Sequence, residues 1–177
     1  MKHKLLAVLL LSMASSLAHA GLTDDLKAKA AAKSKEAATD KANKEVAAKV
    51  NKKLLEESRK NQCSFKSGTD ELEKGCGKKS KKLANQIIDV KKTLQSHGHS
   101  GFKFVVSGHT DSSGDAAKNK ELSARRAQVM VKELVAQGVD AKDIEAVGMG
   151  SENMLVKPDD TPAKKAKNRR YEVQVRF

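Results

Sequence analysis

Residues 102 to 137 constrain the fold most, because two hydrophobic periodicities follow one another there. The apolar run from Phe102 to Val106 has the length of a buried strand. After a polar turn, the segment from about Ala117 to Gln137 carries large side chains four residues apart, which is the spacing of a helix that buries one face. A strand followed by an amphipathic helix indicates an α/β architecture.

The alternation of strands and helices continues on both sides of this unit. A short strand is expected at about Gln62 to Phe65, and a helix follows in which Leu83, Ile87, Val90 and Leu94 share a face. Two more strands are expected at Ile144 to Val147 and Tyr171 to Phe177. Residues 61–177 are therefore predicted to form one α/β sandwich, a small mixed four-stranded sheet with two main helices on one face.

The first twenty residues have the pattern of a secretory signal peptide. Lys2 and Lys4 precede a short apolar core, and Ala18-His19-Ala20 is a small-residue cleavage site. The core is too short to span a bilayer, and Gly21 rather than a cysteine follows the cleavage site. We expect residues 1–20 to be removed, leaving an exported chain with no lipidated cysteine and no integral membrane segment.

Residues 21–60 are predicted to form a long Ala/Lys-rich helical spacer. The segment has no proline, and acid-to-base pairs recur four residues apart, as in Glu45 with Lys49. Large apolar residues are scarce, and only Val46, Val50 and Leu54 make a stripe. Such a helix has no core of its own, and contact with another envelope protein through residues 21–60 stays open.

The charge of the chain points to acidic partners outside the cytoplasm. Removal of the signal peptide lowers the formal charge from +13 to +11, which in an intracellular protein suggests nucleic acid. An exported chain instead meets wall polymers, lipid headgroups and carboxylate-bearing peptides. The aromatic residues that stack on bases are also rare, with no Trp and one Tyr. Nucleic acid is therefore not an expected partner.

Cys63 and Cys76 are the only cysteines, and in an oxidising compartment they are expected to form a structural disulfide. A redox or metal site is less suited to them, because they lack C-x-x-C spacing and a nearby histidine. His97, His99 and His109 are also poor candidates for a metal site, since the first two lie in a glycine-bounded turn. No metal and no other cofactor is expected.

Arg126 occupies a position in the apolar stripe of its helix, between Leu122 and Met130. A buried guanidinium needs a partner or an opening to solvent. Asp111 lies just past the preceding strand, so both groups are expected to flank one crevice at the carboxyl end of that strand. One negative and one positive group suit a zwitterionic ligand, such as an amino acid with free ammonium and carboxylate groups. Arg125 is expected to face solvent.

Several motifs carry a resemblance to a known family. They are Gly108-His109-Thr110-Asp111, Gly114, Asn119, Leu122-Ser123, Arg126-Ala127, Gly138-Val139, Gly148-Met149-Gly150 and Asn168-Arg169-Arg170. In order and spacing they resemble the OmpA-like C-terminal peptidoglycan-binding domain, over most of residues 61–177 but not residues 21–60. We expect an exported member of this family that lacks the outer-membrane barrel.

The resemblance implies noncovalent binding of the diaminopimelate residue in the peptidoglycan stem peptide. Asp111 matches the aspartate that receives the ligand ammonium, and Arg126 matches the arginine that receives the carboxylate. The other motif positions that shape or line this pocket are Thr110, Asn119, Leu122, Ser123 and Phe65. Lys66 departs from the family, where Asp or Asn is frequent, and inside the pocket it would alter ligand preference. Asn168, Arg169 and Arg170 are expected either to fix the loop by hydrogen bonds and ion pairs or to contact the ligand, and the sequence does not distinguish these two roles.

No pattern of an enzyme is present, because the sequence has no G-x-S-x-G elbow, no H-E-x-x-H and no catalytic-cysteine motif. Two hypotheses follow. The first is a wall-associated protein in the periplasm of a Gram-negative bacterium, peripheral to the outer membrane, that links an envelope component to peptidoglycan. The alternative is a periplasmic scaffold that keeps the fold but binds another envelope partner through its basic surface, with Lys66 as the feature that favours it.

Overall fold

The computed structural model describes the backbone of residues 11–66 and 68–177, and side chains from residue 24 onward except at position 67. The chain divides into two compact units, Met1–Asn43 and Lys44–Phe177. Residues 1–10 of the expected signal peptide lie outside the described residues, and residues 11–20 belong to helix α1 (Leu11–Lys60). Within the described part of the chain, no helix combines the length and hydropathy needed to cross a bilayer.

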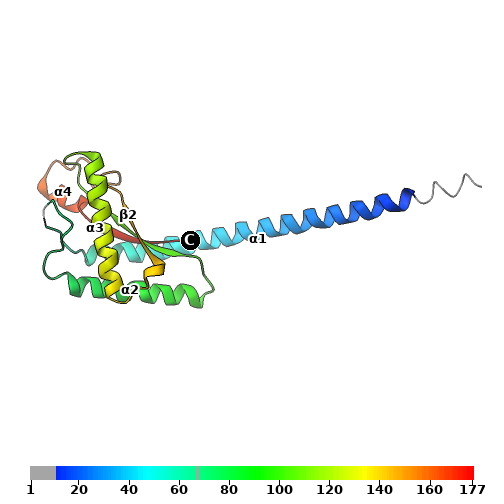
Figure 1. Cartoon of the computed structure of the whole chain (residues 1–177), viewed down its shortest axis with the longest axis horizontal. Coiled ribbons are helices and arrows are strands. Elements are labelled where there is room, and N and C mark those ends of the chain that lie inside the picture. The colour runs from blue at the N-terminus through cyan, green and yellow to red at the C-terminus, as the bar shows by residue number, and fades with distance from the viewer. Residues whose placement is uncertain (1–10, 67) are drawn as a thin grey trace, which may run out of the picture. The chain divides into compact units, whose positions relative to one another are not determined.

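The second unit alternates helices and strands along the chain, as Figure 1 shows. After α1 come α2 (Cys76–Ser96), β1 (Lys103–Gly108), α3 (Ala116–Ala136), a short 3₁₀ helix η1 (Ala141–Asp143), β2 (Ile144–Gly148), α4 (Pro162–Asn168) and β3 (Tyr171–Arg176). The expected α/β class is confirmed. Helix α4 was not expected, although Thr161 caps its first turn by accepting a hydrogen bond from the Lys164 amide.

The sheet has three described strands in the order β2-β1-β3. The central strand β1 pairs with β2 in parallel, with Phe104 opposite Ile144, and with β3 antiparallel, with Phe104 opposite Val175. Helices α2 and α3 pack on one face of this sheet, where a single apolar cluster joins their buried side chains to Phe104, Val106, Val173 and Val175. The prediction of two main helices on one face is therefore correct.

The expected fourth strand at residues 62–65 does not join the sheet. Phe65 instead forms one isolated bridge with Leu72, because the chain folds back on itself directly after it. Two backbone hydrogen bonds close this turn, from Lys66 N to Glu71 O and from Glu73 N to Ser64 O, each 2.9 Å long. Local pairing therefore takes the place of pairing with the sheet.

Side-chain amides satisfy the outer edge of β3 where a fourth strand would lie. Asn51 donates to the Val175 carbonyl (3.0 Å) and accepts from the Val175 amide (2.6 Å). Gln62 does the same at Tyr171, donating to its carbonyl (2.6 Å) and accepting from its amide (3.1 Å). Each amide reproduces the donor and acceptor of a neighbouring strand, so an edge open to foreign strands is covered.

The compact unit begins earlier than the predicted boundary at residue 61, because the last part of α1 packs against the domain. Leu54 is fully buried in the core cluster, and Val46, Ala47 and Val50 pack against the same cluster. The predicted stripe of residues 46, 50 and 54 is thus the face that docks.

Helix α3 lies unusually close to the sheet at the ends of β1 and β2. A Cβ atom on Gly108 would lie 2.2 Å from the Ser123 carbonyl oxygen, and one on Gly148 would lie 2.6 Å from the Lys120 carbonyl oxygen. Only glycine permits this approach of helix backbone to strand backbone. It brings the first half of α3 to the carboxyl ends of the strands.

Candidate functional site

A cleft of about 1040 Å³ opens at the carboxyl end of β1. Its walls come from the end of α1 and the loop after it, the loop that follows β1, the first half of α3, and α4 with the residues just after it. The lining residues used below are Arg59, Gln62, Phe65, Glu73, His109, Thr110, Asp111, Asn119, Leu122, Arg126, Lys167, Arg169 and Arg170. All of them belong to the second unit.

Arg126 is held in this cleft by an aromatic ring and a carbonyl oxygen. Arg126 is 9% exposed. Its Nε donates to the Thr69 carbonyl (2.9 Å), and its guanidinium carbon lies 5.1 Å from the centre of the Phe65 ring. Burial lowers the pKa of Arg126, and the positive charge of Arg169 lowers it further. Among the described residues, no carboxylate forms an ion pair with Arg126, so its terminal NH₂ groups are available to a ligand.

Asp111 faces the same cleft and is already engaged by two donors. Arg169 donates to its Oδ2 (2.8 Å), and the Ser113 amide donates to its Oδ1 (3.0 Å). Burial by itself would raise the pKa of Asp111, but these donors outweigh burial and hold the pKa below its ordinary value. The carboxylate is therefore ionised at neutral pH, with oxygen lone pairs left for a further donor.

The structure separates the other expected site residues into two groups. Phe65, Thr110, Asn119 and Leu122 line the cleft. Asn119 also fixes the preceding loop, because its amide donates to the Ser113 carbonyl (2.8 Å). Thr110 is 4% exposed, and its hydroxyl has no hydrogen-bond partner among the described residues.

Two expected site residues do not line the cleft. Ser123 is fully buried, where its hydroxyl donates to the Lys120 carbonyl (2.8 Å) and accepts from the Gly150 amide (2.9 Å). Lys66 is exposed and forms an ion pair with Glu71 (2.5 Å), which raises the pKa of the Lys66 ammonium. Both residues are structural neighbours of the cleft rather than parts of its wall. Arg125 is exposed, as expected, and lies 3.9 Å from Glu121.

In the motif Asn168-Arg169-Arg170, the asparagine fixes a loop and the two arginines line the cleft. Asn168 is fully buried and accepts from the Leu155 and Val156 amides while it donates to Asp159. Asp159 in turn accepts from the amide of Ser112, beside Asp111. Arg169 pairs with Asp111, whereas Arg170 pairs with buried Glu172 (2.9 Å). The pairing of Arg169 with Asp111 was not predicted, because a sequence does not fix which of two adjacent arginines pairs with a given carboxylate.

Three charged or titratable residues of the cleft wall, Arg59, His109 and Arg170, lie against the buried Glu172. Glu172 accepts from Arg59 (3.0 Å) and from Arg170 (2.9 Å), and His109 Nε2 lies 3.9 Å from its other oxygen. Burial, together with the charge of Arg170, lowers the pKa of His109 to about 4 despite the opposing effect of Glu172. His109 is therefore neutral at pH 7, and Arg59 is a contact that sequence reasoning missed because it lies in the segment interpreted as a spacer.

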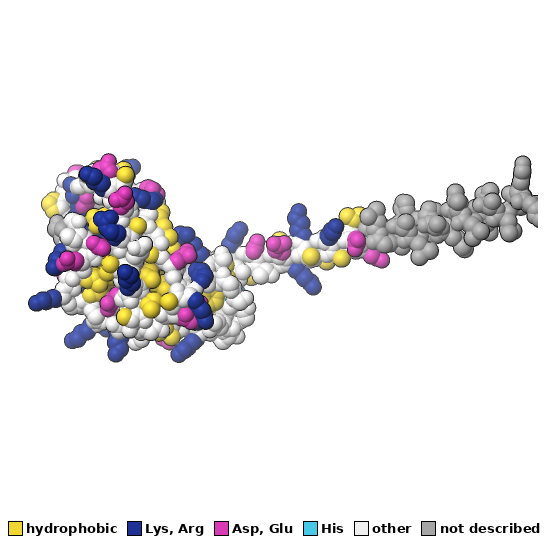
Figure 2. Space-filling model, in the orientation of Figure 1, with side chains coloured by type: hydrophobic (Ala, Val, Ile, Leu, Met, Phe, Trp, Pro, Cys, Tyr) yellow, Lys and Arg dark blue, Asp and Glu magenta, His cyan; other side chains and the backbone are white. Residues whose placement is uncertain are grey.

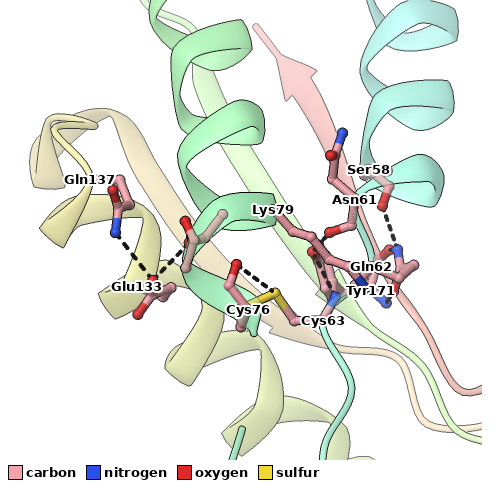
Figure 3. The surroundings of a disulfide bond; sticks show 11 residues. Ser58, Asn61, Gln62, Cys63, Cys76, Lys79, Glu133, Gln137 and Tyr171 are labelled. Carbon is pink, nitrogen blue, oxygen red and sulfur yellow. Dashed lines mark hydrogen bonds between the residues drawn. A yellow bond between two sulfur atoms is a disulfide. The ribbon is translucent and has the colours of Figure 1, made fainter. Parts of the chain in front are cut away.

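The disulfide between Cys63 and Cys76 is present and joins the cleft wall to the start of α2. Figure 3 shows it beside Tyr171, whose hydroxyl donates to the Asn61 carbonyl (2.5 Å) and accepts from the Cys63 amide (3.3 Å). Lys79 also donates to the Gln62 carbonyl (2.9 Å). The covalent link thus holds the loop that carries Phe65 and Thr69, both of which contact Arg126.

His97, His99 and His109 do not gather into one site. His97 and His99 follow α2 before β1 begins, and His109 follows the end of β1, so the six-residue strand separates them. Across the part of the chain that the structure describes, no three His, Cys, Asp or Glu side chains are grouped as metal ligands.

Comparison with known proteins identifies the domain that contains this cleft. Residues 64–169 match the OmpA family, which is more than half of the 177-residue chain. Among curated proteins, the peptidoglycan-binding protein ArfA of Mycobacterium tuberculosis is 41% identical over 73 residues, 41% of this chain and 22% of that protein. The peptidoglycan-associated lipoprotein of Pseudomonas aeruginosa is 37% identical over 75 residues, 42% of this chain and 44% of that protein. The chain therefore spans less than half the length of either relative.

Solved structures share the fold. The peptidoglycan-associated lipoprotein from Burkholderia pseudomallei is 23% identical, with a TM-score of 0.51 over 65% of this chain and 89% of that one. The C-terminal domain of Helicobacter pylori MotB is 24% identical, with a TM-score of 0.51 over 66% of this chain and 84% of that one. The sequence match and the shared fold agree that this chain belongs to the OmpA family.

Proposed function

We propose that this protein binds peptidoglycan noncovalently by holding the diaminopimelate residue of a stem peptide in the cleft. The single observation that carries the proposal is that a carboxylate, Asp111, and a guanidinium, Arg126, line one cleft without forming an ion pair with each other. A ligand with one free ammonium and one free carboxylate complements this arrangement. Two relatives are named for binding to or association with peptidoglycan, which supports the same class of ligand.

Each side chain has a distinct part in the proposed complex. Asp111 accepts the ligand ammonium, and Arg126 donates its terminal NH₂ groups to the ligand carboxylate. Arg169 keeps Asp111 ionised and oriented through its hydrogen bond. Phe65 supports the Arg126 guanidinium from one side, and Leu122 and Thr110 complete the wall. The role is binding alone, with no bond made or broken.

The proposed setting is the periplasm of a Gram-negative bacterium, where an exported chain meets the wall. The last part of helix α1, from Lys44 onward, belongs to the domain. Contact of the first part of α1 with another envelope protein would make the chain a link between that protein and the wall. The alternative of a scaffold with a different partner relied on Lys66, and this residue lies outside the cleft wall, paired with Glu71. We therefore favour wall binding.

Calorimetric titration with a soluble stem peptide that contains diaminopimelate tests the proposal. The parent should bind, and Asp111→Ala and Arg126→Ala should each weaken binding at least tenfold, because each leaves a ligand charge unpaired in a partly desolvated cleft. Arg125→Ala is the matched control, since it removes the adjacent guanidinium of α3 from the exposed side and should bind like the parent.

A second peptide tests the assignment of the ligand carboxylate to Arg126. A stem peptide with lysine in place of diaminopimelate lacks the distal carboxylate, so it should bind weakly and respond little to Arg126→Ala. Absence of binding by the parent, or an equal loss in the Arg125 control, would sink the proposal.

A further inference from the structure

Five exposed lysines lie within nine residues at the start of α2 and just before it. They are Lys74, Lys78, Lys79, Lys81 and Lys82, called the lysine stripe here. Within the described residues, none of the five forms an ion pair, and Lys79 alone donates to a backbone carbonyl, that of Gln62. Some lysines elsewhere on the domain do pair with acids, as Lys91 with Asp140 and Lys120 with Glu152.

Apart from the hydrogen bond of Lys79 to Gln62, the fold gains no described contact from lysines at these positions. The first turn of α2 contains no acidic residue, and the amino end of a helix carries a partial positive charge that disfavours cations. Lys78 and Lys82 are also four residues apart, where like charges repel on a helix surface. These costs are not offset by ion pairs within the described residues, so an anionic partner outside the domain explains the stripe better than stability does.

The lysine stripe borders the cleft. Glu73 lines the cleft, Lys74 follows it directly, and the Cys63–Cys76 disulfide joins the cleft wall to the first residue of α2. The core-facing residues of α2 include Ser80, Leu83 and Ile87, so Lys78, Lys81 and Lys82 project away from the core. In Figure 2, Lys and Arg side chains project from the edge of the domain where Figure 1 places α2.

We propose that the lysine stripe is a second contact surface for the same wall polymer, which binds the carboxylates of stem peptides next to the one held in the cleft. This inference rests on the proposed function of the cleft. A polymer anchored by one stem peptide presents its neighbouring carboxylates at high effective concentration, so even weak contacts with exposed lysines increase the total affinity. The contribution is electrostatic and therefore declines as salt screens it.

The test compares the full chain with the triple variant Lys78→Ala/Lys81→Ala/Lys82→Ala on intact wall sacculi and on the soluble diaminopimelate stem peptide. The triple variant should bind sacculi about tenfold more weakly at low salt, and the difference should shrink at about 0.5 M salt. Its affinity for the soluble peptide should be unchanged, because the cleft is intact. Its melting temperature should equal or exceed that of the parent, which excludes misfolding as the cause.

The matched control is Lys27→Ala/Lys29→Ala/Lys33→Ala, which removes three exposed lysines from the first unit. Equal losses in both triple variants, or unchanged sacculus binding by the stripe variant, would overturn the proposal. Stripe-dependent binding to vesicles of phosphatidylglycerol and phosphatidylethanolamine, without stripe-dependent sacculus binding, would overturn it in favour of a lipid surface. Failure of the proposed function of the cleft is detected separately: the parent would then not bind the soluble peptide, or Asp111→Ala would bind it as tightly as the parent does.

Discussion

The two parts of helix α1 have similar helix-forming sequence but opposite surroundings. From residue 24 to residue 42 every described side chain is exposed, including Leu26 at 59%. From Lys44 onward the same helix belongs to the compact unit, and Leu54 and Ser58 are fully buried. Both parts are rich in lysine, and the first is also rich in alanine. Helix propensity thus made one continuous helix, while a few side chains decided which part joined the domain.

The side chains that make the difference are of two kinds. Val46, Val50 and Leu54 supply the apolar stripe that reaches the core. Asn51 and Arg59 supply polar contacts to Val175 and Glu172 on β3. In the first part, small alanines alternate with charges, and such a surface has too little apolar area to repay docking.

Deletion gives the largest expected contrast between the two parts. Removing residues 44–60 should prevent stable folding of the second unit, with a loss above about 5 kcal/mol, because it opens the core at Leu54 and uncovers the β3 edge. Removing residues 24–43 should change stability by less than about 0.5 kcal/mol. Urea unfolding followed by tyrosine fluorescence measures both, since Tyr171 is the only tyrosine and is 1% exposed. Equal losses of stability from the two deletions would contradict the distinction between the two parts of α1.

A single leucine in each part repeats the contrast on a smaller scale. Leu54→Ala should destabilise the domain by about 3–4 kcal/mol, because it leaves a cavity at a fully buried site. Leu26→Ala should leave the unfolding midpoint in urea unchanged, since Leu26 is exposed. A comparable loss from Leu26→Ala would mean that the first part of α1 packs against something in solution.

The second unit should also respond to pH through His109, which faces Glu172 and Arg170. Burial lowers its pKa from 6.5 to about 4, so the unfolded chain takes up the proton first as pH falls. Stability should therefore decline by about 2–3 kcal/mol as pH falls from 6.5 towards 4, beyond the effect of other groups. His109→Asn should remove this component in urea titrations at several pH values, whereas His97→Asn at the exposed end of α2 should retain it.

Loss of the amide cover at the β3 edge should have the smallest of these effects. Asn51→Ala leaves the Val175 amide and carbonyl without the Asn51 partner, and should lower the free energy of unfolding by about 1–2 kcal/mol. Lys52→Ala, one residue along the helix and exposed, is the control and should be neutral. An equally neutral Asn51→Ala would show that water replaces the amide without loss.

The sequence predicted the elements whose periodicity is strong. The helix that carries Leu83, Ile87, Val90 and Leu94 and the three strands of the sheet lie close to their expected positions, since a buried face leaves a clear pattern. Arg126 was singled out because a charge in an apolar stripe is unusual. Phe65, Asp111 and Arg126 do line one cleft, as expected.

What the sequence did not reveal depends on contacts between distant residues. Local pairing of Phe65 with Leu72 replaced the expected strand, and nothing in residues 62–65 distinguishes pairing with a sheet from pairing with the next turn. The choice of Arg169 for Asp111, and of Arg170 for Glu172, also depends on how the last loop approaches β1. The docking of residues 44–60 was missed because a short apolar stripe on a charged helix has no unique partner in sequence.

The amide bonds at β3 have a consequence for how the domain assembles. Asn51 and Val175 are 124 positions apart along the chain, yet each needs the other to complete its hydrogen bonds. The helix that forms readily by itself therefore lacks its polar partners Val175 and Glu172 until the last strand has paired with β1, and such distant closure is entropically slow. We therefore expect α1 to dock late in folding, after the final strand has joined the sheet.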